Sequence, residues 1–161
     1  MNQKNSSSAL ATFGAGCFWG VQALFDKTLG VISTRVGYTG GTTGKPTYHQ
    51  VCTDTTGHAE AVEVVYDPRK VTYEHLLQVF WENHNPTTPN QQGPDFGSQY
   101  RSVIFYHSPA QKKTAETSKK TYQKKMDKKI VTEIVPAMTF YPAEDYHQKY
   151  LEKRGLVSCH I

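Results

Sequence analysis

Hydrophobic and polar positions along this chain alternate with two different periods. Residues 59–66 place apolar side chains at every second position on one face, which predicts a strand. Residues 109–128 repeat apolar and small side chains, among them Ala115 and Tyr122, at helical spacing, which predicts a helix with one inward stripe. The same patterns predict strands at 11–16, 31–38, 102–106 and 130–136, and helices at 18–29, 72–83 and 143–150. Such a mixture indicates packed α and β layers.

The length of 161 residues, with 37% apolar and 20% charged residues, is typical of one soluble domain with its own core. We expect a single catalytic domain over residues 1–161, with a flexible N-terminus at 1–9 and a mobile tail at 151–161. No apolar run reaches membrane length, and the polar opening lacks the profile of a signal peptide. These features predict no membrane association and a cytoplasmic location.

The net charge of +4 comes largely from eight lysines in residues 112–129. A nucleic-acid surface would use such lysines on phosphates, but this segment has no arginine for base edges and only Tyr122 for stacking. A solvated helix face explains the pattern better, since the lysines lie outside the apolar stripe. We therefore expect no nucleic-acid partner.

The three cysteines stand at positions 17, 52 and 159 and include no C-x-x-C pair. This odd number argues against a disulfide framework, and the spacing argues against a four-ligand zinc site. Cys159, His160 and His147 would crowd any metal into the terminal tail without the spacing of a structural site, so we expect no metal. The cysteines fit free thiols in a reducing compartment.

Cys17 has the most informative surroundings, within Gly16-Cys17-Phe18-Trp19-Gly20 at a predicted junction of strand and helix. In the first turn of a helix, free backbone N–H groups and the helix dipole stabilise a thiolate. Phe18 and Trp19 supply an apolar wall for a small apolar group. The alternative is a buried, inert cysteine among apolar residues.

Glu60 opens the predicted strand at 59–66, and strand alternation places it on the face of Val62 and Val64, opposite Glu63. If that face packs against the core, loss of hydration raises the pKa of Glu60 and makes it a proton donor near neutral pH. If Glu60 instead lies at the strand's open end, it simply reaches water. The sequence leaves both interpretations open.

Two further segments bring tyrosines toward possible binding loops. Tyr38 precedes Gly40 and Gly41, and Tyr100 follows a loop at 85–98 that is rich in Gly, Pro, Asn and Gln. Their hydroxyls could donate hydrogen bonds to a polar oxygen beside the thiol. Tyrosines that only fill core or surface are the alternative.

Five motifs, in order, cover almost the whole chain from about residue 12 and resemble the peptide methionine sulfoxide reductase A family. They are Gly16-Cys17-Phe18-Trp19-Gly20, Arg35-Val36-Gly37-Tyr38-Thr39-Gly40-Gly41, Thr56-Gly57-His58-Ala59-Glu60-Ala61, Gly93-Pro94-Asp95 with Gln99-Tyr100-Arg101-Ser102, and Tyr141-Pro142-Ala143-Glu144-Asp145-Tyr146-His147-Gln148. The resemblance implies an α+β fold: a two-layer α/β sandwich with a mixed sheet, a ferredoxin-like core and a C-terminal coil tail.

The resemblance also implies an oxidoreductase that reduces the S epimer of methionine sulfoxide, free or in proteins, to methionine. Cys17 would attack the sulfoxide sulfur while Glu60 protonates the departing oxygen, because the S–O bond yields only to both together. Tyr38 and Tyr100 would hold that oxygen. Phe18 and Trp19 would receive the methyl group.

Loss of methionine would leave Cys17 as a sulfenic acid, which a second thiol condenses into a disulfide. By resemblance that thiol is Cys159, and thioredoxin, or dithiothreitol in vitro, re-reduces the disulfide. The enzyme would need no cofactor and would act as a monomer on oxidised proteins and free methionine sulfoxide. Cys52 matches a position where relatives have a non-catalytic cysteine, which we interpret as structural.

Asp95 would anchor the substrate's backbone amide, helped by His84. The chain departs from the family pattern at Asn85, where an aspartate is common, and at Gln91, where an arginine is common. The loss of a carboxylate and a guanidinium changes the rim of the site, so protein-substrate preference is the property that this departure puts in question.

A cysteine hydrolase is the main alternative from another class. It would pair Cys17 with a histidine such as His58 or His147 and form an acyl intermediate. A carboxylate, rather than a histidine, in the second clear motif counts against it. A phosphate-binding loop at 37–44 is weaker still, since Lys45 is followed by Pro46 and not by serine or threonine.

Overall fold

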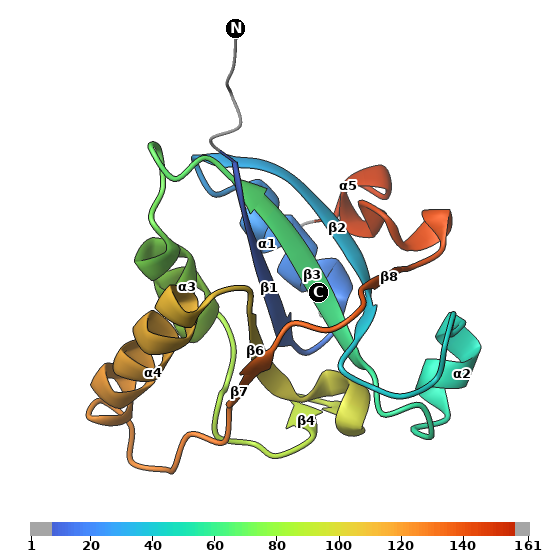
Figure 1. Ribbon diagram of the computed structural model, residues 1–161. Coiled ribbons are helices and arrows are strands. Elements are labelled where there is room, and N and C mark those ends of the chain that lie inside the picture. Colours follow the sequence, from blue (N-terminus) through green and yellow to red (C-terminus); the bar gives the residue numbers. More distant parts are fainter. Residues whose placement is uncertain (1–7, 157–161) are drawn as a thin grey trace, which may run out of the picture.

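The computed structural model describes residues 8–156, and Figure 1 shows a twisted sheet with helices packed against it. The strands are β1 (Ala9–Ala15), β2 (Val31–Thr39), β3 (Ala59–Tyr66), β4 (Gln91–Gln92), β5 (Asp95–Phe96), β6 (Ser102–Tyr106), β7 (Glu133–Pro136) and β8 (Tyr141–Pro142). The helices are α1 (Phe18–Asp26), α2 (Tyr48–Cys52), α3 (Tyr73–Glu82), α4 (Pro109–Gln123) and α5 (Tyr150–Lys153), with 3-10 turns η2 (Ser98–Tyr100) and η3 (Asp145–His147).

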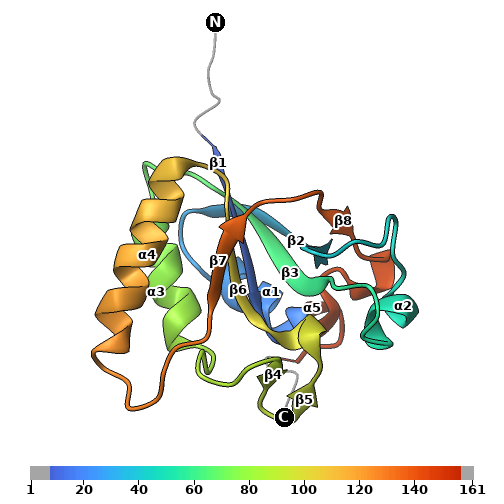
Figure 2. The ribbon, with the colours of Figure 1, turned by 60° about the horizontal axis from the view of Figure 1, so that its bottom comes forward.

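The main sheet of the described residues has six strands in the order β7-β6-β1-β3-β2-β8. Neighbouring strands run antiparallel except β6 and β7, which are parallel. β4 and β5 pair with each other in a separate two-stranded ribbon. The predicted α+β fold with a mixed sheet is confirmed. Figure 2 shows α3 and α4 side by side at one edge of the molecule, away from α5 and α2.

The long elements lie close to their predicted positions. The strand predicted at 59–66 is β3 with the same bounds, whereas the helices predicted at 18–29 and 109–128 end earlier, at Asp26 and Gln123. The periodicity missed the short elements α2, β4, β5 and β8. These have two to five residues each, too few to show a period, and they are held by caps and by pairing with distant segments.

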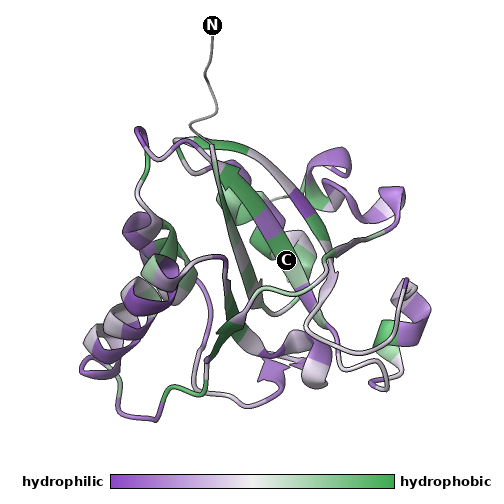
Figure 3. Cartoon of the chain, in the orientation of Figure 1, coloured by the Kyte–Doolittle hydropathy of each residue, from purple (hydrophilic) through white to green (hydrophobic). Residues whose placement is uncertain are grey.

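The core lies between the sheet and α1 and α3. Phe13 of β1 stacks on Phe25 of α1 and Phe80 of α3, with ring centroids 5.1 and 5.2 Å apart. The β3 side chains Val62 and Val64 are fully buried in this same cluster. Figure 3 shows β3 as a largely hydrophobic strand, interrupted by hydrophilic positions. The face of β3 that carries Val62 and Val64 is therefore the packed face.

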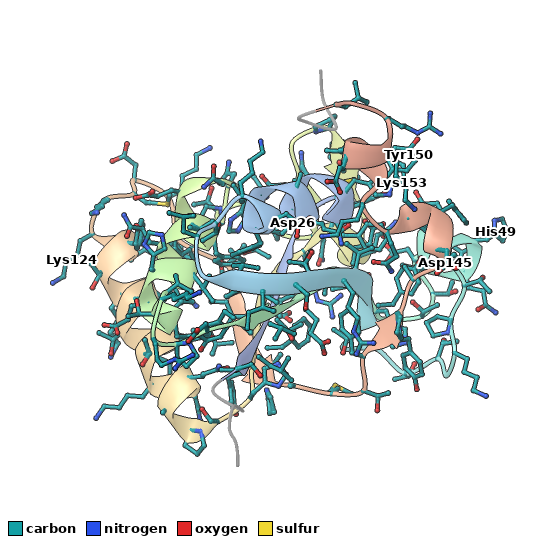
Figure 4. All side chains as sticks on the ribbon, turned by 90° about the horizontal axis from the view of Figure 1, so that it is seen from above. Asp26, His49, Lys124, Asp145, Tyr150 and Lys153 are labelled. Carbon is teal, nitrogen blue, oxygen red and sulfur yellow. The ribbon has the colours of Figure 1, made fainter. Side chains whose placement is uncertain are left out.

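The lysine-rich helix has the predicted inward stripe. Ala115 is buried, and the ring of Tyr122 stacks on Trp81 of α3 at 5.8 Å. The Trp81 indole donates to the hydroxyl of Ser118 at 2.7 Å. Most of the paired lysines are exposed, and Figure 4 shows Lys124 pointing away from the molecule. The lysines thus form a solvated face, as expected.

The C-terminal coil predicted from residue 151 is wrong for its first part. Residue 151 belongs to α5, and the Leu151 side chain is only 2% exposed. The segment is held to α1 by the ion pair of Lys149 with Asp26, at 2.7 Å, and by stacking of Tyr150 on Trp19. At the other end Ala9, expected to be flexible, pairs with β3. Residues 1–7 and 157–161, including Cys159, lie outside the described residues.

Within residues 8–156, no helix combines the length and the hydropathy needed to cross a membrane.

Candidate active site

Cys17 lies at the N-cap of α1, one residue before the helix begins, rather than in its first turn as predicted. The half-buried Cys17 still stands at the positive end of the helix dipole, so a stabilised thiolate remains the prediction. Gly16 precedes it with φ of +95°, and a Cβ there would come within 2.6 Å of the Gln92 side chain. Only glycine fits this tight approach of the β1–α1 junction to β4.

Glu60 lies directly beside the Cys17 helix end. Its side chain is only 2% exposed, and its Oε1 accepts the backbone N–H of Phe18 at 3.2 Å. The structure therefore decides between the two interpretations of Glu60, because the β3 face that carries it is the packed one. Removal of a carboxyl group from water favours its protonated form. Since Glu60 binds the N–H of the residue that follows Cys17, its carboxyl group can donate a proton to a group that the thiol attacks.

Aromatic rings line the same end of α1. Phe18 is 1% exposed and contacts the rings of Tyr38 and His147, with centroids 5.7 and 5.2 Å away. Trp19 is half-buried, and its indole stacks flat on Tyr150 of α5, which Figure 4 labels, at 3.8 Å. This arrangement makes the predicted apolar wall from one buried ring and one accessible ring.

The hydroxyl of Tyr38 has a different role from the predicted one. It donates to Glu144 Oε1 at 2.9 Å, and the ring is fully buried. Glu144 Oε2 in turn accepts the backbone N–H of Tyr48 at 3.0 Å. Tyr38 therefore connects β2 to the segment before η3 and, through Glu144, to the start of α2. We correct its assignment from a group that holds the substrate oxygen to one that positions Tyr48.

Tyr48 is the site residue that the sequence argument missed. The cap at Thr47, whose hydroxyl accepts the Gln50 N–H, starts α2 there and fixes Tyr48 as its first residue. Burial raises the pKa of Tyr48, with smaller contributions from Cys52, Glu60 and Tyr100, which lie near it. The T-x-x-Q pattern of this capping box signals the start of α2 in the sequence, but it gives no sign that Tyr48 belongs to the site.

Tyr100 lies where the sequence placed it. Burial, and then the charges of Glu60, Cys52, Asp95 and Cys17, raise the pKa of Tyr100. At neutral pH its phenol is therefore a neutral hydrogen-bond donor, and it lies close enough to Glu60 and Cys17 to interact electrostatically with both. Tyr38 is the cross-strand neighbour of Glu60, but its hydroxyl is held by Glu144. Tyr48 and Tyr100 therefore remain as the candidate pair of phenols near Glu60.

Asp95, on β5, is half-buried and belongs to the same electrostatic cluster through Tyr100. Cys52 is an exposed free cysteine at the end of α2, next to Tyr48. The site thus draws its groups from β1, α1, β3, α2, β5 and η2, which lie far apart in the chain.

His147, which the sequence suggested as the partner of Cys17 in the alternative hydrolase, packs against the aromatic wall instead. It is fully buried, and its Nδ1 accepts the Trp19 indole N–H at 2.9 Å. Burial lowers the pKa of His147 against the opposing charge of Glu144, so the ring is neutral with its proton on Nε2. Within residues 8–156 that nitrogen has no hydrogen-bond partner. Because the ring is fully buried, His147 holds Trp19 in the aromatic wall and is closed off from a substrate.

His84 does not join the site as expected. Its Nδ1 donates to the carbonyl oxygen of Phe80 at 2.6 Å, and its Nε2 accepts from the Ser102 hydroxyl at 2.7 Å. With both ring nitrogens used by the protein, His84 holds α3 to β6 and has none left for a substrate amide. We therefore remove it from the substrate-binding residues.

Burial lowers the pKa of His84 to about 4, although its hydrogen bond to Phe80 acts in the opposite direction. The unfolded chain therefore binds a proton on this ring between pH 6.5 and 4 that the folded chain does not, so stability falls as the pH falls through this window. We expect His84→Gln to reduce the slope of unfolding free energy against pH there, by at most about 1.4 kcal/mol per pH unit. Urea denaturation from pH 4.5 to 7 measures it.

His75→Gln, an exposed change on α3, the helix that ends just before His84, is the control for this slope. An unchanged slope in the His84 variant would contradict the assignment of His84 as a buried neutral ring.

The rim positions that depart from the family pattern are built into a turn. Asn85 Oδ1 accepts the Thr87 N–H at 3.0 Å, and the Asn85 backbone N–H donates to the Gln92 side chain at 2.8 Å. Gln91 donates to the carbonyl oxygen of Gly93 at 3.1 Å. Both side chains therefore support the loop itself, and the rim is neutral where charges were expected.

The geometry argues against the cysteine hydrolase. His58 accepts the Gly41 N–H at 3.0 Å and contacts the Thr43 carbonyl oxygen at 2.6 Å, so both ring nitrogens are used by the loop between β2 and α2. His147 uses Nδ1 for Trp19. The group next to the Cys17 helix end is a carboxyl, not an imidazole. In the part of the chain that the structure describes, no cluster of His, Cys, Asp or Glu could hold a metal ion.

Comparisons with known proteins agree with this geometry. The family model described as peptide methionine sulfoxide reductase matches residues 9–161. A Geobacter sulfurreducens protein, peptide methionine sulfoxide reductase MsrA, is 58% identical over 97% of this chain and 98% of its own length. The structure of methionine sulfoxide reductase A of Corynebacterium diphtheriae covers 96% of this chain and 79% of its own, with a TM-score of 0.91 and 41% identity.

Saccharomyces cerevisiae Mxr1 in complex with Trx2 covers 93% of this chain and 89% of its own, with a TM-score of 0.65 and 29% identity.

Proposed function

Since the chain belongs to the peptide methionine sulfoxide reductase family, we propose that it reduces the S epimer of methionine sulfoxide, free and in proteins, to methionine at Cys17 and Glu60. The observation that carries the assignment of these residues is the hydrogen bond from the Phe18 N–H to Glu60. It sets a buried carboxyl one residue from the only described cysteine at a helix N-cap. Nucleophile and acid are the two groups that this reduction needs.

In the first step the Cys17 thiolate attacks the sulfoxide sulfur while Glu60 delivers a proton to the oxygen. The new bond between the two sulfurs and the S–O bond then break as the hydroxyl group passes to the Cys17 sulfur. The substrate sulfur thus gains two electrons and leaves as methionine, and the cysteine sulfur loses two and becomes a sulfenic acid. Substrate sulfur is therefore reduced without any cofactor, and the oxidising equivalent is left on Cys17.

Tyr48 and Tyr100 hold the sulfoxide oxygen in this proposal. Both are neutral phenols, and each interacts electrostatically with Glu60. Two neutral donors aimed at an oxygen that gains negative charge stabilise the transition state more than the ground state. Tyr38 acts through Glu144 on the position of Tyr48.

The remaining groups bind the rest of the substrate. Phe18 and Trp19 contact the methyl group, and Asp95 accepts the backbone N–H of the oxidised residue. The fully buried His147 acts on the substrate only through Trp19, whose indole N–H it accepts. Since Trp19 is the accessible part of the wall, the epimer whose methyl group lies against it presents its oxygen to the tyrosines.

Cys159 resolves the sulfenic acid in this proposal. Its thiolate attacks the Cys17 sulfur, water leaves, and a disulfide forms. Thioredoxin then reduces the disulfide by thiol exchange, a partner that the complex of the related Mxr1 with Trx2 supports, and dithiothreitol replaces it in vitro. We further propose that the protein acts in the cytoplasm as a monomer without a metal.

The Cys159→Ser variant tests this second half of the cycle. We expect it to form about one methionine per enzyme in a single turnover at the wild-type rate, because Cys17 and Glu60 are intact. With thioredoxin as the only reductant, further turnover should stop, since no disulfide forms for thioredoxin to attack. Methionine per enzyme, measured by chromatography at intervals, gives both quantities.

The matched control is Cys52→Ser, which removes the other thiol and should leave thioredoxin-driven turnover in place. Continued turnover of the Cys159 variant with thioredoxin would contradict the resolving role, and loss of turnover in the Cys52 variant would transfer that role to Cys52.

A further inference from the structure

Asp54 has an unusual backbone conformation just past the C-terminal end of α2. It follows the C-cap Thr53, its φ is +60°, and its N–H donates to the carbonyl oxygen of Val51 at 3.0 Å. This left-handed position ends helices and favours glycine, whereas aspartate is tolerated there only at some cost. A non-glycine residue in such a conformation suggests that its side chain makes a contact that offsets this cost.

The Asp54 carboxylate reaches across 44 residues of sequence to the start of η2. Its Oδ1 accepts the backbone N–H of Ser98 at 3.2 Å and also accepts the Ser98 hydroxyl. On the other side of the same residue, Arg101 donates to the carbonyl oxygen of Ser98 at 2.9 Å and to that of Gly57 at 3.0 Å. Ser98 is thus bound at its N–H, hydroxyl and carbonyl groups by charged side chains.

These contacts join the two segments that carry the phenols. α2 has only five residues, with Tyr48 at its beginning and Asp54 two residues past its end. η2 has only three, with Ser98 at its beginning and Tyr100 at its end. Neither element can hold its orientation by its own length. The spacing of the two hydroxyls therefore depends on what fastens one segment to the other.

We propose that Asp54 is a positioning residue that sets the spacing of the Tyr48 and Tyr100 hydroxyls by fastening α2 to η2 through Ser98. This inference rests on the proposed function, in which both hydroxyls hold the sulfoxide oxygen. Asp54 touches neither substrate nor thiol. Its effect is indirect: if the two hydroxyls move slightly away from the developing oxyanion, the rate of the first step falls although both donors are still present.

Asp54→Gly is the informative variant, because glycine keeps the left-handed turn at the end of α2 and removes only the carboxylate. We expect the single-turnover rate on the S epimer to fall about tenfold, a smaller loss than full misplacement of a reacting group brings. Asp54→Asn, whose amide oxygen can accept from Ser98, should recover most of the rate. Ser98→Ala should cause an intermediate loss.

Lys45→Gly is the matched control. Lys45 is also a non-glycine residue at positive φ, 46°, and it is exposed in the loop before α2. Its replacement relieves the same kind of backbone strain without touching η2, so the rate should stay at the wild-type value. Thermal melting of each variant checks that it is folded under the assay conditions.

The decisive readout is coupling to a phenol. In a Tyr48→Phe background the spacing of two hydroxyls no longer exists, so Asp54→Gly should lower the remaining rate less than about twofold. A tenfold loss in both backgrounds would overturn the proposal, since it would show that Asp54 acts on general stability or on Cys17. A wild-type rate for folded Asp54→Gly would also overturn it.

Failure of the proposed function has a separate sign. In that case the wild-type protein itself forms no methionine from the S epimer, whatever stands at position 54.

Discussion

The Cys17→Ser variant should form no methionine from either epimer of methionine sulfoxide. Serine at the N-cap has nearly the same size and leaves the helix start intact, but its hydroxyl is not ionised there and cannot carry the oxygen away as a sulfenic acid. Removal of a covalent nucleophile costs more than about 10⁴-fold in rate. The measurement is methionine per enzyme with dithiothreitol in excess, over hours.

Cys52→Ser is the control for the Cys17 variant as well, because Cys52 is a free cysteine nearby whose loss changes no proposed chemical step. Methionine formation by the Cys17 variant above the level of an enzyme-free blank would remove Cys17 from the mechanism. It would then be necessary to look for the nucleophile at Cys52 or Cys159.

The Glu60→Gln variant should slow the first step by about 10²–10⁴-fold, the range for loss of a general acid. The glutamine Oε1 can still accept the Phe18 N–H, so the start of α1 keeps its position. What disappears is the proton that the departing oxygen needs. Single-turnover methionine formation, in rapid-quench samples of pre-reduced enzyme with the S epimer, measures this step without interference from disulfide reduction.

The matched control for Glu60 stands three residues further along the same strand. Glu63 points to the opposite side of β3 and pairs with Arg35 at 2.7 Å, away from the thiol. Glu63→Gln should therefore react at the wild-type rate. A Glu60→Gln variant within threefold of wild type would mean that the proton comes from elsewhere, with the tyrosines as the next candidates.

The local pattern of β3 was sufficient to place Glu60 on one face together with Val62 and Val64. It could not say whether that face is covered, because α1 and α3, which cover it, come from other parts of the chain. The sequence therefore supported both interpretations of Glu60 equally, and only the fold shows that its side chain is buried. Long elements were predictable because their periodicity is local, and their burial was not predictable because it depends on segments that are distant in the sequence.

The tyrosine assignment shows the opposite situation. Tyr38 was predicted for this role because it ends a predicted strand beside glycines, and Tyr48 was not considered. The fold buries the Tyr38 hydroxyl against Glu144, more than 100 residues away, and leaves Tyr48 beside Tyr100. Hydrogen-bond partners at such separations are set by tertiary structure and leave no local signal.

His84 illustrates the same limit. Motif order placed it near Asp95, and it is near in sequence, yet its ring turns to Phe80 and Ser102 and holds α3 to β6. No sequence pattern indicated a role for Asp54, since its left-handed backbone and its contact with Ser98 exist only in the folded chain. Residues that position other residues are thus the part of the site that sequence patterns miss.

The most direct test of the central claim is a single-turnover assay with pre-reduced protein, no added reductant, and the S and R epimers of a blocked methionine sulfoxide supplied separately. The account predicts about one methionine per enzyme from the S epimer, none from the R epimer, and a peptide map in which Cys17 is linked to Cys159. No methionine from either epimer would contradict the account.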